Sequence, residues 1–398
     1  MAEALRSFGV KLGPLQVVFG PNTIGCLEPW LERHKSVAII TGRSSAEKSG
    51  ALKDLLELLD KSGVTYDIYR NVTPNPTDSI VDSAAEFVWR SGAQAVIAVG
   101  GGSVIDTAKL ASAIARCGGR AKEYIKGSRA ACASLPLAAI NLTHGTGSEV
   151  NRYAVATIED TNEKVGVASD CFYPQISIDD PRYTTSLPEN QTIYTSLDAL
   201  YHSLEASTSI LASPYTVVLG EEAVRLIAKW LPRAVERPDD IEARYWLLYA
   251  SLLGGIAIDN SRTHLIHSME HALTGLNPKL AHGAGLAILG PAVIELIYKA
   301  APEAAYRLLR HIDGSLEPSR ESASRARRAL AIFQKKVGFS ETLRDYGFTR
   351  EQVEDVKRIV LGTLRHVARL APFDVKPEAV ERIYLELVES PSHHREEL

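Results

Sequence analysis

The first half of the chain alternates short β-branched runs with amphipathic windows, and this alternation constrains the fold more than any other feature. The run SVAII (residues 36–40) is typical of a buried strand, and residues 45–63 carry the apolar period of a helix. A strand at 64–70 with a helix at 77–92 repeats the pair, and 93–116 adds a strand, a glycine turn and a helix. Further strands are expected at 134–142 and 174–181. Such alternation predicts βαβ units around a parallel sheet.

The pattern changes near Leu187, where strand signals fade and long helical windows take over. Examples span residues 213–236, 321–338 and 351–371. A chain of 398 residues is too long for one small core and suits two domains. We therefore predict an α/β nucleotide-binding type of domain with a parallel sheet over residues 1–187 and an all-helical domain over residues 188–398. Ligands of such folds bind at the carboxyl ends of the strands, so we expect the site in the interdomain cleft.

Composition excludes several function classes. Hydrophobic residues make up 45% and charged residues 23%, which is the balance of a soluble globular protein. Lys plus Arg number 44 against 48 for Asp plus Glu, so no basic excess indicates a nucleic-acid partner. The N-terminus lacks the pattern of a signal peptide, and the apolar runs are shorter than the ~18 residues of a membrane span. Four cysteines without a CxxC pair argue against a disulfide scaffold, and we expect a cytoplasmic protein.

Three glycines, Gly100 to Gly102, separate a predicted strand from a helix that opens at Ser103. Glycine lets the backbone approach a ligand closely, and a helix N-terminus offers free N–H groups with a partial positive charge. A pyrophosphate fits this arrangement, although a tight turn that binds nothing has the same sequence. The motif is neither a Walker P-loop nor GxGxxG. A second Gly/Thr/Ser cluster at residues 141–150 also follows a strand, and two loops at one sheet edge can clasp one dinucleotide.

An acid and an imidazole stand four residues apart in the otherwise apolar or small segment Thr195–Thr208. Asp198 and His202 therefore share one face of a predicted helix. A simple Asp–His hydrogen bond at a helix boundary explains the pair equally well, so other residues must decide whether a metal binds there.

Four further histidines fall within residues 262–282. His264, His267 and His271 follow one another at helical spacing, and His282 comes after a turn-like stretch. A helix with Asp-x3-His and a His-rich helix can converge nitrogen and oxygen ligands, with no thiolate among them. Imidazoles with one carboxylate suit Fe²⁺, Zn²⁺, Ni²⁺ or Co²⁺ better than Mg²⁺ or Ca²⁺.

These motifs, in this order, resemble those of the iron-containing (group III) alcohol dehydrogenases, and the resemblance covers nearly the whole chain. Its anchors are PNPT (74–77), GGGSVIDTAK (100–109), GTGSEV (145–150), LDALYHSLEA (197–206) and HSMEHALTG…LAHG (267–283). The family's plan, which dehydroquinate synthase shares, is an α/β dinucleotide-binding domain followed by an all-α metal-binding domain, in agreement with the fold expected from the pattern.

The resemblance implies a role for each matching residue. Metal ligands are implied at Asp198, His202, His267 and His282, and His271 matches a family histidine that helps in proton transfer near the substrate. The cofactor contacts that we expect lie in or beside the motifs PNPT, GGGSVID, LTHGTGSE and NEKVG: Asn75, Gly101, Gly102, Ser103, Asp106, Thr143, Thr146 and Lys164. His144 departs from the family, which usually has a small residue there.

Cofactor choice depends on the end of the first strand of the sheet. In this family an acid at that position binds the adenosine ribose and repels a 2′-phosphate. Gly42 stands there instead, and Arg43, Ser44 and Ser45 follow it with donors that suit a phosphate. We therefore predict a preference for NADP(H) over NAD(H), although a plain capped turn with Arg43 in solvent fits the same residues.

The combined expectation is a metal-dependent alcohol dehydrogenase or aldehyde reductase that passes hydride between a small alcohol and NAD(P). We expect one divalent metal, with Fe²⁺ ahead of Zn²⁺ or Ni²⁺, a homodimer, and no nucleic-acid or membrane partner. The alternative is a dehydroquinate synthase-like lyase, whose polyanionic substrate needs several Lys or Arg residues near the metal. The ligand helices carry almost none, Arg262 being the exception. A non-catalytic relative is disfavoured because all four ligand positions are filled.

Overall fold

A six-stranded, fully parallel sheet forms the first half of the protein in the computed structural model, which describes residues 13–389. The N-terminal residues 1–12 and the C-terminal residues 390–398 lie outside the described residues. The spatial order is β1-β8-β5-β4-β2-β3. The strands are β1 (Gln16–Phe19), β2 (Ser36–Gly42), β3 (Thr65–Val72), β4 (Ala95–Gly100), β5 (Leu137–Asn141) and β8 (Ile176–Asp179). The parallel α/β half predicted from the alternating pattern is confirmed.

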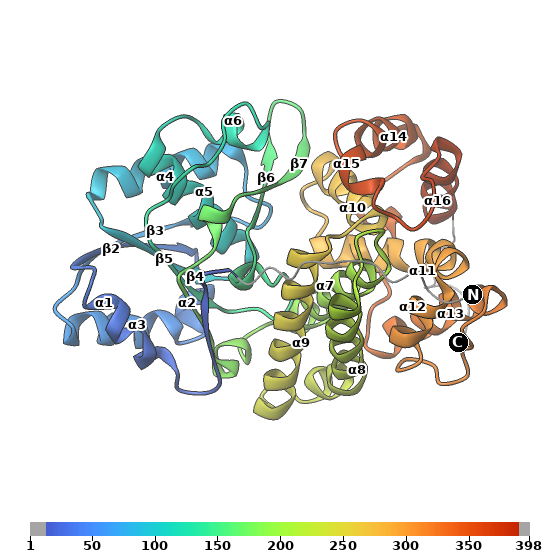
Figure 1. Ribbon diagram of the computed structural model, residues 1–398, viewed down its shortest axis with the longest axis horizontal. Coiled ribbons are helices and arrows are strands. Elements are labelled where there is room, and N and C mark those ends of the chain that lie inside the picture. Colours follow the sequence, from blue (N-terminus) through green and yellow to red (C-terminus); the bar gives the residue numbers. More distant parts are fainter. Residues whose placement is uncertain (1–12, 390–398) are drawn as a thin grey trace.

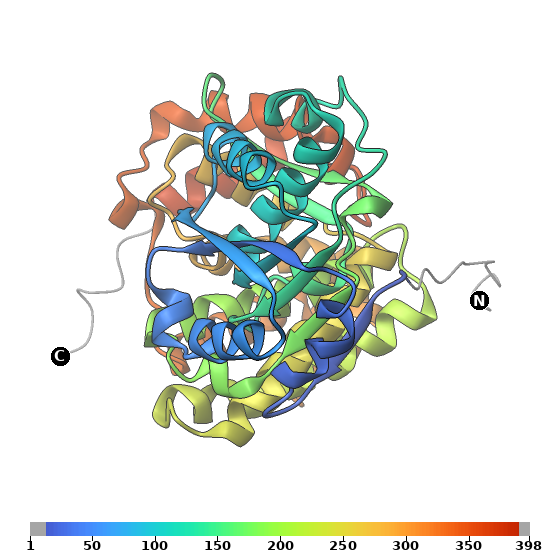
Figure 2. The same ribbon diagram turned by 90° about the vertical axis from the view of Figure 1, so that its left-hand side faces the viewer.

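Helices cover both faces of this sheet because its strands are apolar on both sides. In β2, Ala38 and Ile40 enter the core beneath α4 and α5, whereas Val37 and Ile39 enter the core beneath α1 and α3. Figure 2 shows the sheet edge-on between these two helical layers. The helices of this half are α1 (Glu28–Leu31), α2 (Ser45–Lys48), α3 (Ala51–Lys61), α4 (Asp78–Ser91), α5 (Gly102–Cys117) and α6 (Ala121–Ile125).

Two local features differ from the pattern. The single helix expected over residues 45–63 breaks at Gly50, whose φ of 81° is a left-handed conformation that glycine adopts without strain. An antiparallel hairpin, β6 (Tyr153–Ile158) and β7 (Glu163–Ala168), was not expected and stands apart from the main sheet.

Two of the four cysteines lie close together. Cys117 and Cys132, which are 15 residues apart in the chain, have their sulfur atoms 3.7 Å apart, and both are free thiols.

The second half is helical, and its first helix, α7 (Glu189–Thr208), lies in the middle of the molecule (Figure 1). It packs against α8, α9 and α11, and nearly all of its length is buried. The other helices are α8 (Pro214–Glu236), α9 (Ile241–Asn260), α10 (Leu265–Leu276), α11 (His282–Ala300), α12 (Pro302–Leu309), α13 (Ala323–Lys336), α14 (Val353–Leu361), α15 (Arg365–Ala368) and α16 (Pro377–Glu389). The helical second half is confirmed as well.

One helix among residues 13–389 is long and apolar enough to cross a membrane by length and composition, contrary to the short apolar runs expected. This helix, α11, has 19 residues because it continues through Pro291, and 72% of the window tested is buried inside the protein. It packs against α7, α10 and α13, as a central core helix does.

The topology brings three loops to one edge of the sheet. β2, β4 and β5 are neighbours and run in the same direction, so Gly42, Gly100 and Asn141 end at the same side. Helices α7 and α10 of the second half supply the side chains that face this edge. The expected location of a site, at the carboxyl ends of the strands, is therefore where the two halves meet.

Candidate functional site

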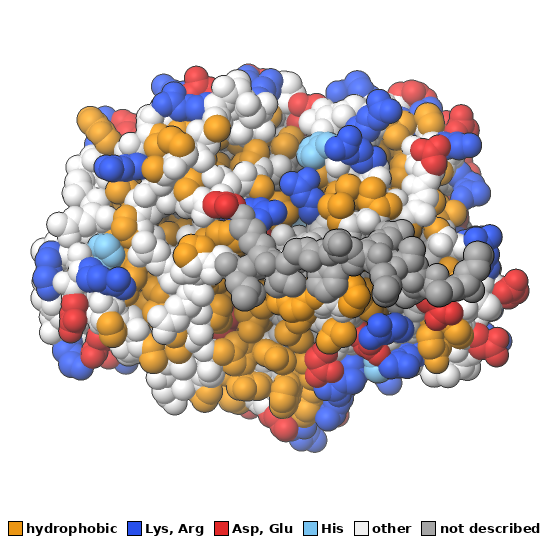
Figure 3. Space-filling view, viewed as in Figure 1, with side chains coloured by type: hydrophobic (Ala, Val, Ile, Leu, Met, Phe, Trp, Pro, Cys, Tyr) orange, Lys and Arg blue, Asp and Glu red, His pale blue; other side chains and the backbone are white. Residues whose placement is uncertain are grey.

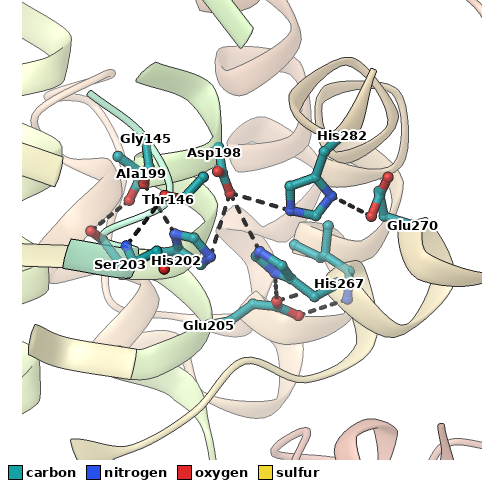
Figure 4. A network of polar contacts seen from close by, with 12 residues as sticks. Gly145, Thr146, Asp198, Ala199, His202, Ser203, Glu205, His267, Glu270 and His282 are labelled. Carbon is teal, nitrogen blue, oxygen red and sulfur yellow. Dashed lines mark hydrogen bonds and ion pairs between the residues drawn. The ribbon is translucent and has the colours of Figure 1, made fainter. Parts of the chain in front are cut away.

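Three imidazoles surround one carboxylate oxygen in the interior between the two halves. The Nε2 atoms of His202, His267 and His282 lie 3.4, 3.6 and 3.6 Å from Oδ1 of Asp198. Asp198 and His202 are one turn apart on α7, His267 is on α10, and His282 is the first residue of α11. Figure 4 shows the three rings pointing toward the carboxylate. The four residues that the sequence marked as ligands therefore converge on one point.

The opposite nitrogen of each ring has its own acceptor. Nδ1 of His202 lies 3.3 Å from the carbonyl oxygen of Gly145, that of His267 contacts Glu205, and that of His282 contacts Glu270 (Figure 4). In a neutral ring, an acceptor at Nδ1 places the proton there and leaves the lone pair on Nε2. Each ring is thus oriented so that its free nitrogen faces Asp198.

Glu205 and Glu270 have functions that sequence reasoning missed. Glu205 also accepts the backbone N–H of Ile266 and contacts Nδ1 of His264, which makes His264 a structural partner of this carboxylate. The sequence does contain a signal for these two acids, because each follows an expected metal ligand by three residues: Glu205 follows His202, and Glu270 follows His267. An acid at i+3 from a histidine shares its helix face.

Burial and charge act in opposite directions on these groups. Burial alone would raise the pKa of Asp198, but the imidazoles around it lower the pKa to about 2. Burial lowers the pKa of His202 to about 4, so this ring is neutral and offers a lone pair. Burial also disfavours the charged form of His267, yet Glu205 and Asp198 outweigh it and raise its pKa to about 9, so a cation that binds Nε2 of this ring must displace a proton. The Asp198 and Glu205 carboxylates are therefore ionised at neutral pH, as a metal ligand and the acceptor that orients its neighbour would need to be.

Two donor atoms in the centre have no hydrogen-bond partner among the described residues. They are Oδ1 of Asp198 and Nε2 of His267, and both are buried. Donor atoms of Asp198, His267 and His282 all lie within 4.8 Å of one another. His202 lies outside that tight trio but has the shortest distance to Asp198, and its ring stacks on His267 with centroids 4.6 Å apart. A divalent cation fits this set because it would satisfy both unpartnered atoms at once.

His271 lies beside the centre rather than in it. Its ring centroid is 6.5 Å from that of His267 and 5.6 Å from that of His282, and no contact joins it to Asp198. The Nζ atom of Lys164, a residue of β7, lies 3.4 Å from the Glu270 carboxylate and 3.2 Å from the side-chain oxygen of Asn75. Burial, followed by the charge of Lys164, lowers the pKa of His271.

A cavity of about 220 Å³ connects the histidine centre with the glycine loop. Six of the residues expected to contact the cofactor line it: Asn75, Gly102, Ser103, Asp106, Thr146 and Lys164. A side chain at Gly101 would collide with Thr143 at 2.6 Å, and one at Gly102 with Thr146 at 2.5 Å. The two loops therefore touch each other, and glycine is required because the threonines occupy the space of a Cβ atom.

Asp106 and Asn75 already have protein partners. The Asp106 carboxylate accepts bonds from Ser148 and from the backbone N–H of Val155, which ties α5 to the start of the hairpin. The Asn75 amide donates to the carbonyl oxygen of Pro278 at 3.1 Å, which joins the two halves. Both residues line the cavity, so each can present its remaining polar atoms to a ligand while holding the wall in place.

The segment Gly42–Ser45 does not line this cavity. Gly42 ends β2, Arg43 and Ser44 precede the short helix α2, and these two residues and Ser45, the first residue of α2, are exposed. Their position at the same sheet edge, beyond the glycine loop, suits the far end of an extended dinucleotide. Glu47, the nearest following acid, forms an ion pair with Arg70.

His144 ties the second loop to the helical half. Its buried ring lies 3.1 Å from the hydroxyl oxygens of Thr195 and Ser196 on α7, and its Nε2 lies 3.0 Å from Nη1 of Arg244 on α9. Burial and the charge of Arg244 lower the pKa of His144 to about 3, so the ring accepts a hydrogen bond from the guanidinium. The large residue in place of a small one is thus a tether for the loop whose Gly145 orients His202.

Comparison with known proteins matches nearly all of the described chain to one group. Residues 14–181 match the family described as iron-containing alcohol dehydrogenase, and residues 192–388 match the C-terminal family of the Fe-containing alcohol dehydrogenases. A long-chain primary alcohol dehydrogenase of Thermoanaerobacter ethanolicus is 39% identical, with 92% of this chain and 94% of that protein covered. A mitochondrial hydroxyacid-oxoacid transhydrogenase of Xenopus laevis is 30% identical, with 87% and 82% covered. The crystal structure of NADH-dependent butanol dehydrogenase A from Thermotoga maritima superposes with a TM-score of 0.87 at 31% identity, covering 96% of this chain and 98% of that one.

Proposed function

The chain belongs to the iron-containing alcohol dehydrogenase family, and we propose that it is a metal-dependent oxidoreductase that passes hydride between a primary alcohol or aldehyde and NADP(H). One observation carries the proposal. The oxygen of Asp198 with three inward-facing imidazole nitrogens lies in the same cavity as the glycine loop at Gly102 and Ser103. Substrate and nicotinamide can therefore meet beside a Lewis acid.

We propose Asp198, His202, His267 and His282 as the metal ligands. Three imidazoles and one carboxylate favour Fe²⁺, with Zn²⁺ or Ni²⁺ as the next choices. A bound divalent metal polarises a carbonyl or lowers the pKa of an alcohol oxygen. Glu205 and Glu270 hold two of the rings through Nδ1, which keeps their Nε2 atoms available.

The surrounding residues bind the cofactor and handle the proton. The backbone N–H groups at Gly102 and Ser103, at the N-terminus of α5, would hold the pyrophosphate, and Thr143 and Thr146 would close over it from the second loop. Asn75, Asp106 and Lys164 would complete the wall on the nicotinamide side. His271 would take the proton of the substrate hydroxyl on a ring nitrogen during oxidation and return it during reduction.

We propose NADP(H) rather than NAD(H) as the preferred cofactor. Gly42 supplies neither the ribose hydrogen bond nor the negative charge that a carboxylate would give there. Arg43 forms no ion pair with a carboxylate among residues 13–389 and is free to meet a 2′-phosphate. Since one structural relative is named for NADH, this preference would distinguish the present chain from it.

The lyase alternative is not favoured. Lys164 and Arg262 are the lysine and arginine side chains that line the described cavity, and Lys164 is already engaged with Glu270. A polyanionic substrate would need more positive charge than this pair offers.

Elemental analysis and a substrate screen test the proposal together. The purified protein should retain about one Fe, Zn or Ni per chain after dialysis, and should reduce aldehydes or oxidise primary alcohols with NADP(H) or NAD(H). Long-chain alcohols and hydroxyacids, which name the substrates of two relatives, belong in the panel. His282→Ala should lose both metal and turnover, with unchanged circular dichroism as the folding control. Full turnover of that variant would refute the site.

We also propose that the protein is a homodimer, which sedimentation velocity will test.

A further inference from the structure

The cavity continues beyond the histidine centre to a wall that carries positive charge. Tyr153, Arg262 and His366 line the same cavity as Asp198 and His271. Tyr153 begins β6, Arg262 lies in the connection between α9 and α10, and His366 is on α15. Basic side chains gather on the surface over α15 in Figure 3. The proposed hydride transfer does not use this wall.

The backbone of Arg262 is strained. Its φ of 90° lies in the left-handed region, which glycine adopts freely and residues with a Cβ atom rarely adopt. The residue follows α9 by two positions and precedes α10 by three, so a glycine would make the same connection without strain. Strain of this kind persists where the side chain has a function that outweighs it.

The guanidinium of Arg262 has room for a ligand. It is half-buried, its Nε donates to the hydroxyl oxygen of Tyr153 at 3.2 Å, and its Cζ lies 5.8 Å from the centroid of that ring. It forms no ion pair with a carboxylate of the described residues. The two terminal nitrogens therefore keep their donors for a planar anion.

Arg152 packs against the same tyrosine as Arg262 but differs from it in its surroundings. Its Cζ lies 5.7 Å from the centroid of the Tyr153 ring, at almost the same distance as that of Arg262. Arg152 does not line the cavity, however, and Asp259 is close enough to stabilise its charge. Of these two arginines, Arg262 alone presents an uncompensated charge to the substrate space.

We propose that Arg262 binds a carboxylate at the end of the substrate opposite to its reacting carbon, so that the preferred aldehydes are ω-oxoacids. This inference rests on the proposed function. In the reaction, the aldehyde carbon gains a hydride from C4 of the reduced nicotinamide and its oxygen gains a proton, which yields an ω-hydroxyacid and the oxidised cofactor. The carboxylate itself does not change. It pairs with the planar fork of Arg262, and Tyr153 keeps the fork in place.

Paired substrates that differ only in the charged end test the inference. Specificity constants are measured for 4-oxobutanoate and for pentanal, a neutral aldehyde of similar length, in wild type, Arg262→Gly, Arg262→Lys and Arg152→Gln. The wild type should favour 4-oxobutanoate, and Arg262→Gly should lower the ratio of the two constants about 10- to 100-fold. Arg262→Lys should retain part of the preference, and Arg152→Gln should leave the ratio as in wild type. A series of oxoacids from two to six carbons should have its optimum at the chain length that reaches Arg262.

The outcomes separate this inference from the proposed function. If neither aldehyde is reduced, the proposed function fails. If pentanal is reduced but the ratio is the same in wild type and Arg262→Gly, the role of Arg262 is refuted while the proposed function stands. A preference for glyceraldehyde 3-phosphate over every oxoacid would overturn the choice of a carboxylate. If Arg262→Gly changes only the KM of the cofactor, Arg262 binds the cofactor and not the substrate, and the inference is wrong. Thermal unfolding of Arg262→Gly controls for folding, and relief of the left-handed strain predicts a Tm no lower than that of wild type.

Discussion

The Glu205 carboxylate accepts a hydrogen bond from Nδ1 of His267, so an acid buried on α7 fixes the orientation of a ring on α10. The same carboxylate accepts the backbone N–H of Ile266 at 2.6 Å, which anchors it at the start of α10. Asp198 lies two turns earlier on α7 and faces the other nitrogen of the same ring. One helix therefore holds both the expected ligand and the group that orients its neighbour.

Glu205→Gln should weaken metal binding without unfolding the protein. The amide can still accept one bond, but it removes the negative charge and can turn a donor toward the Nδ1–H of His267. Loss of such an orienting group typically costs 10- to 100-fold in metal affinity. Competition with a chromogenic chelator measures the dissociation constant. Glu221→Gln, which removes a carboxylate paired with Arg307 and Arg310 far along α8, is the matched control and should bind metal as wild type does.

His271→Ala should keep its metal and lose rate. The ring of His271 stands beside His267 and His282 but does not reach Asp198, so a proton-transfer role is expected rather than ligation. Removal of a general acid–base group commonly costs about 100-fold or more in turnover. Metal content by elemental analysis and kcat across a pH series measure the two properties separately. If the variant loses metal as readily as His267→Ala, His271 is a ligand and the assignment is wrong.

The pH dependence of stability should reflect the buried acids Glu149 and Asp179. Burial raises the pKa of both carboxyl groups, that of Asp179 to about 7. Since the folded protein holds these protons more tightly than the unfolded chain, the stabilisation is full below about pH 4 and is lost as the pH rises through 7. Asp179→Asn cannot ionise, and it removes the negative charge that, after burial, raises the pKa of Glu149.

The variant should therefore lose less stability than wild type between pH 4.5 and 7.5. At the upper end it should be more stable by on the order of 2–4 kcal/mol, since one unit of pKa shift corresponds to about 1.4 kcal/mol. Thermal unfolding at a series of pH values gives both curves. Parallel curves for the two proteins would show that Asp179 ionises normally in the folded state.

Local patterns predicted the sheet and the helices that carry the expected ligands, because the information for these elements lies within a few residues of each other. The buried run at 36–40 became β2, and the i to i+4 spacing put Asp198 and His202 on one face of α7. The break at Gly50 could not be predicted in this way, because the apolar period continues across it and only the left-handed turn interrupts the helix.

Contacts between distant parts of the chain lay beyond such patterns. His144 and Arg244 are 100 residues apart, and neither residue has a sequence context that marks a pair. Glu270 was visible beside His271 but had no function until the fold placed His282 against it. The hairpin β6–β7 lies outside the six-stranded sheet and its two strands are antiparallel, so the strand–helix alternation of the parallel sheet did not predict it.

Cofactor choice provides the sharpest test of a single position. A Cβ atom at Gly42 would lie 3.5 Å from the Ser45 hydroxyl and 3.5 Å from the carbonyl oxygen of Val72, which are ordinary contacts. Gly42→Asp can therefore be made without a clash, and it adds the ribose acceptor and the repulsion that the native residue lacks. A charge-assisted contact between Arg43 and a 2′-phosphate contributes about 1.5–3 kcal/mol, or one to two decades of preference for NADP(H).

The wild type should accordingly favour NADPH over NADH in kcat/KM on one aldehyde, and Gly42→Asp should move that ratio toward NADH. Arg43→Ala should raise the KM for NADPH while it leaves the KM for NADH nearly unchanged, because NADH has no phosphate at that position. Glu47 cannot substitute for the missing acid, since Arg70 neutralises it in an ion pair. A wild type that prefers NADH, with a ratio insensitive to Arg43→Ala, would mean that Arg43 points to solvent and that Gly42 only ends the strand.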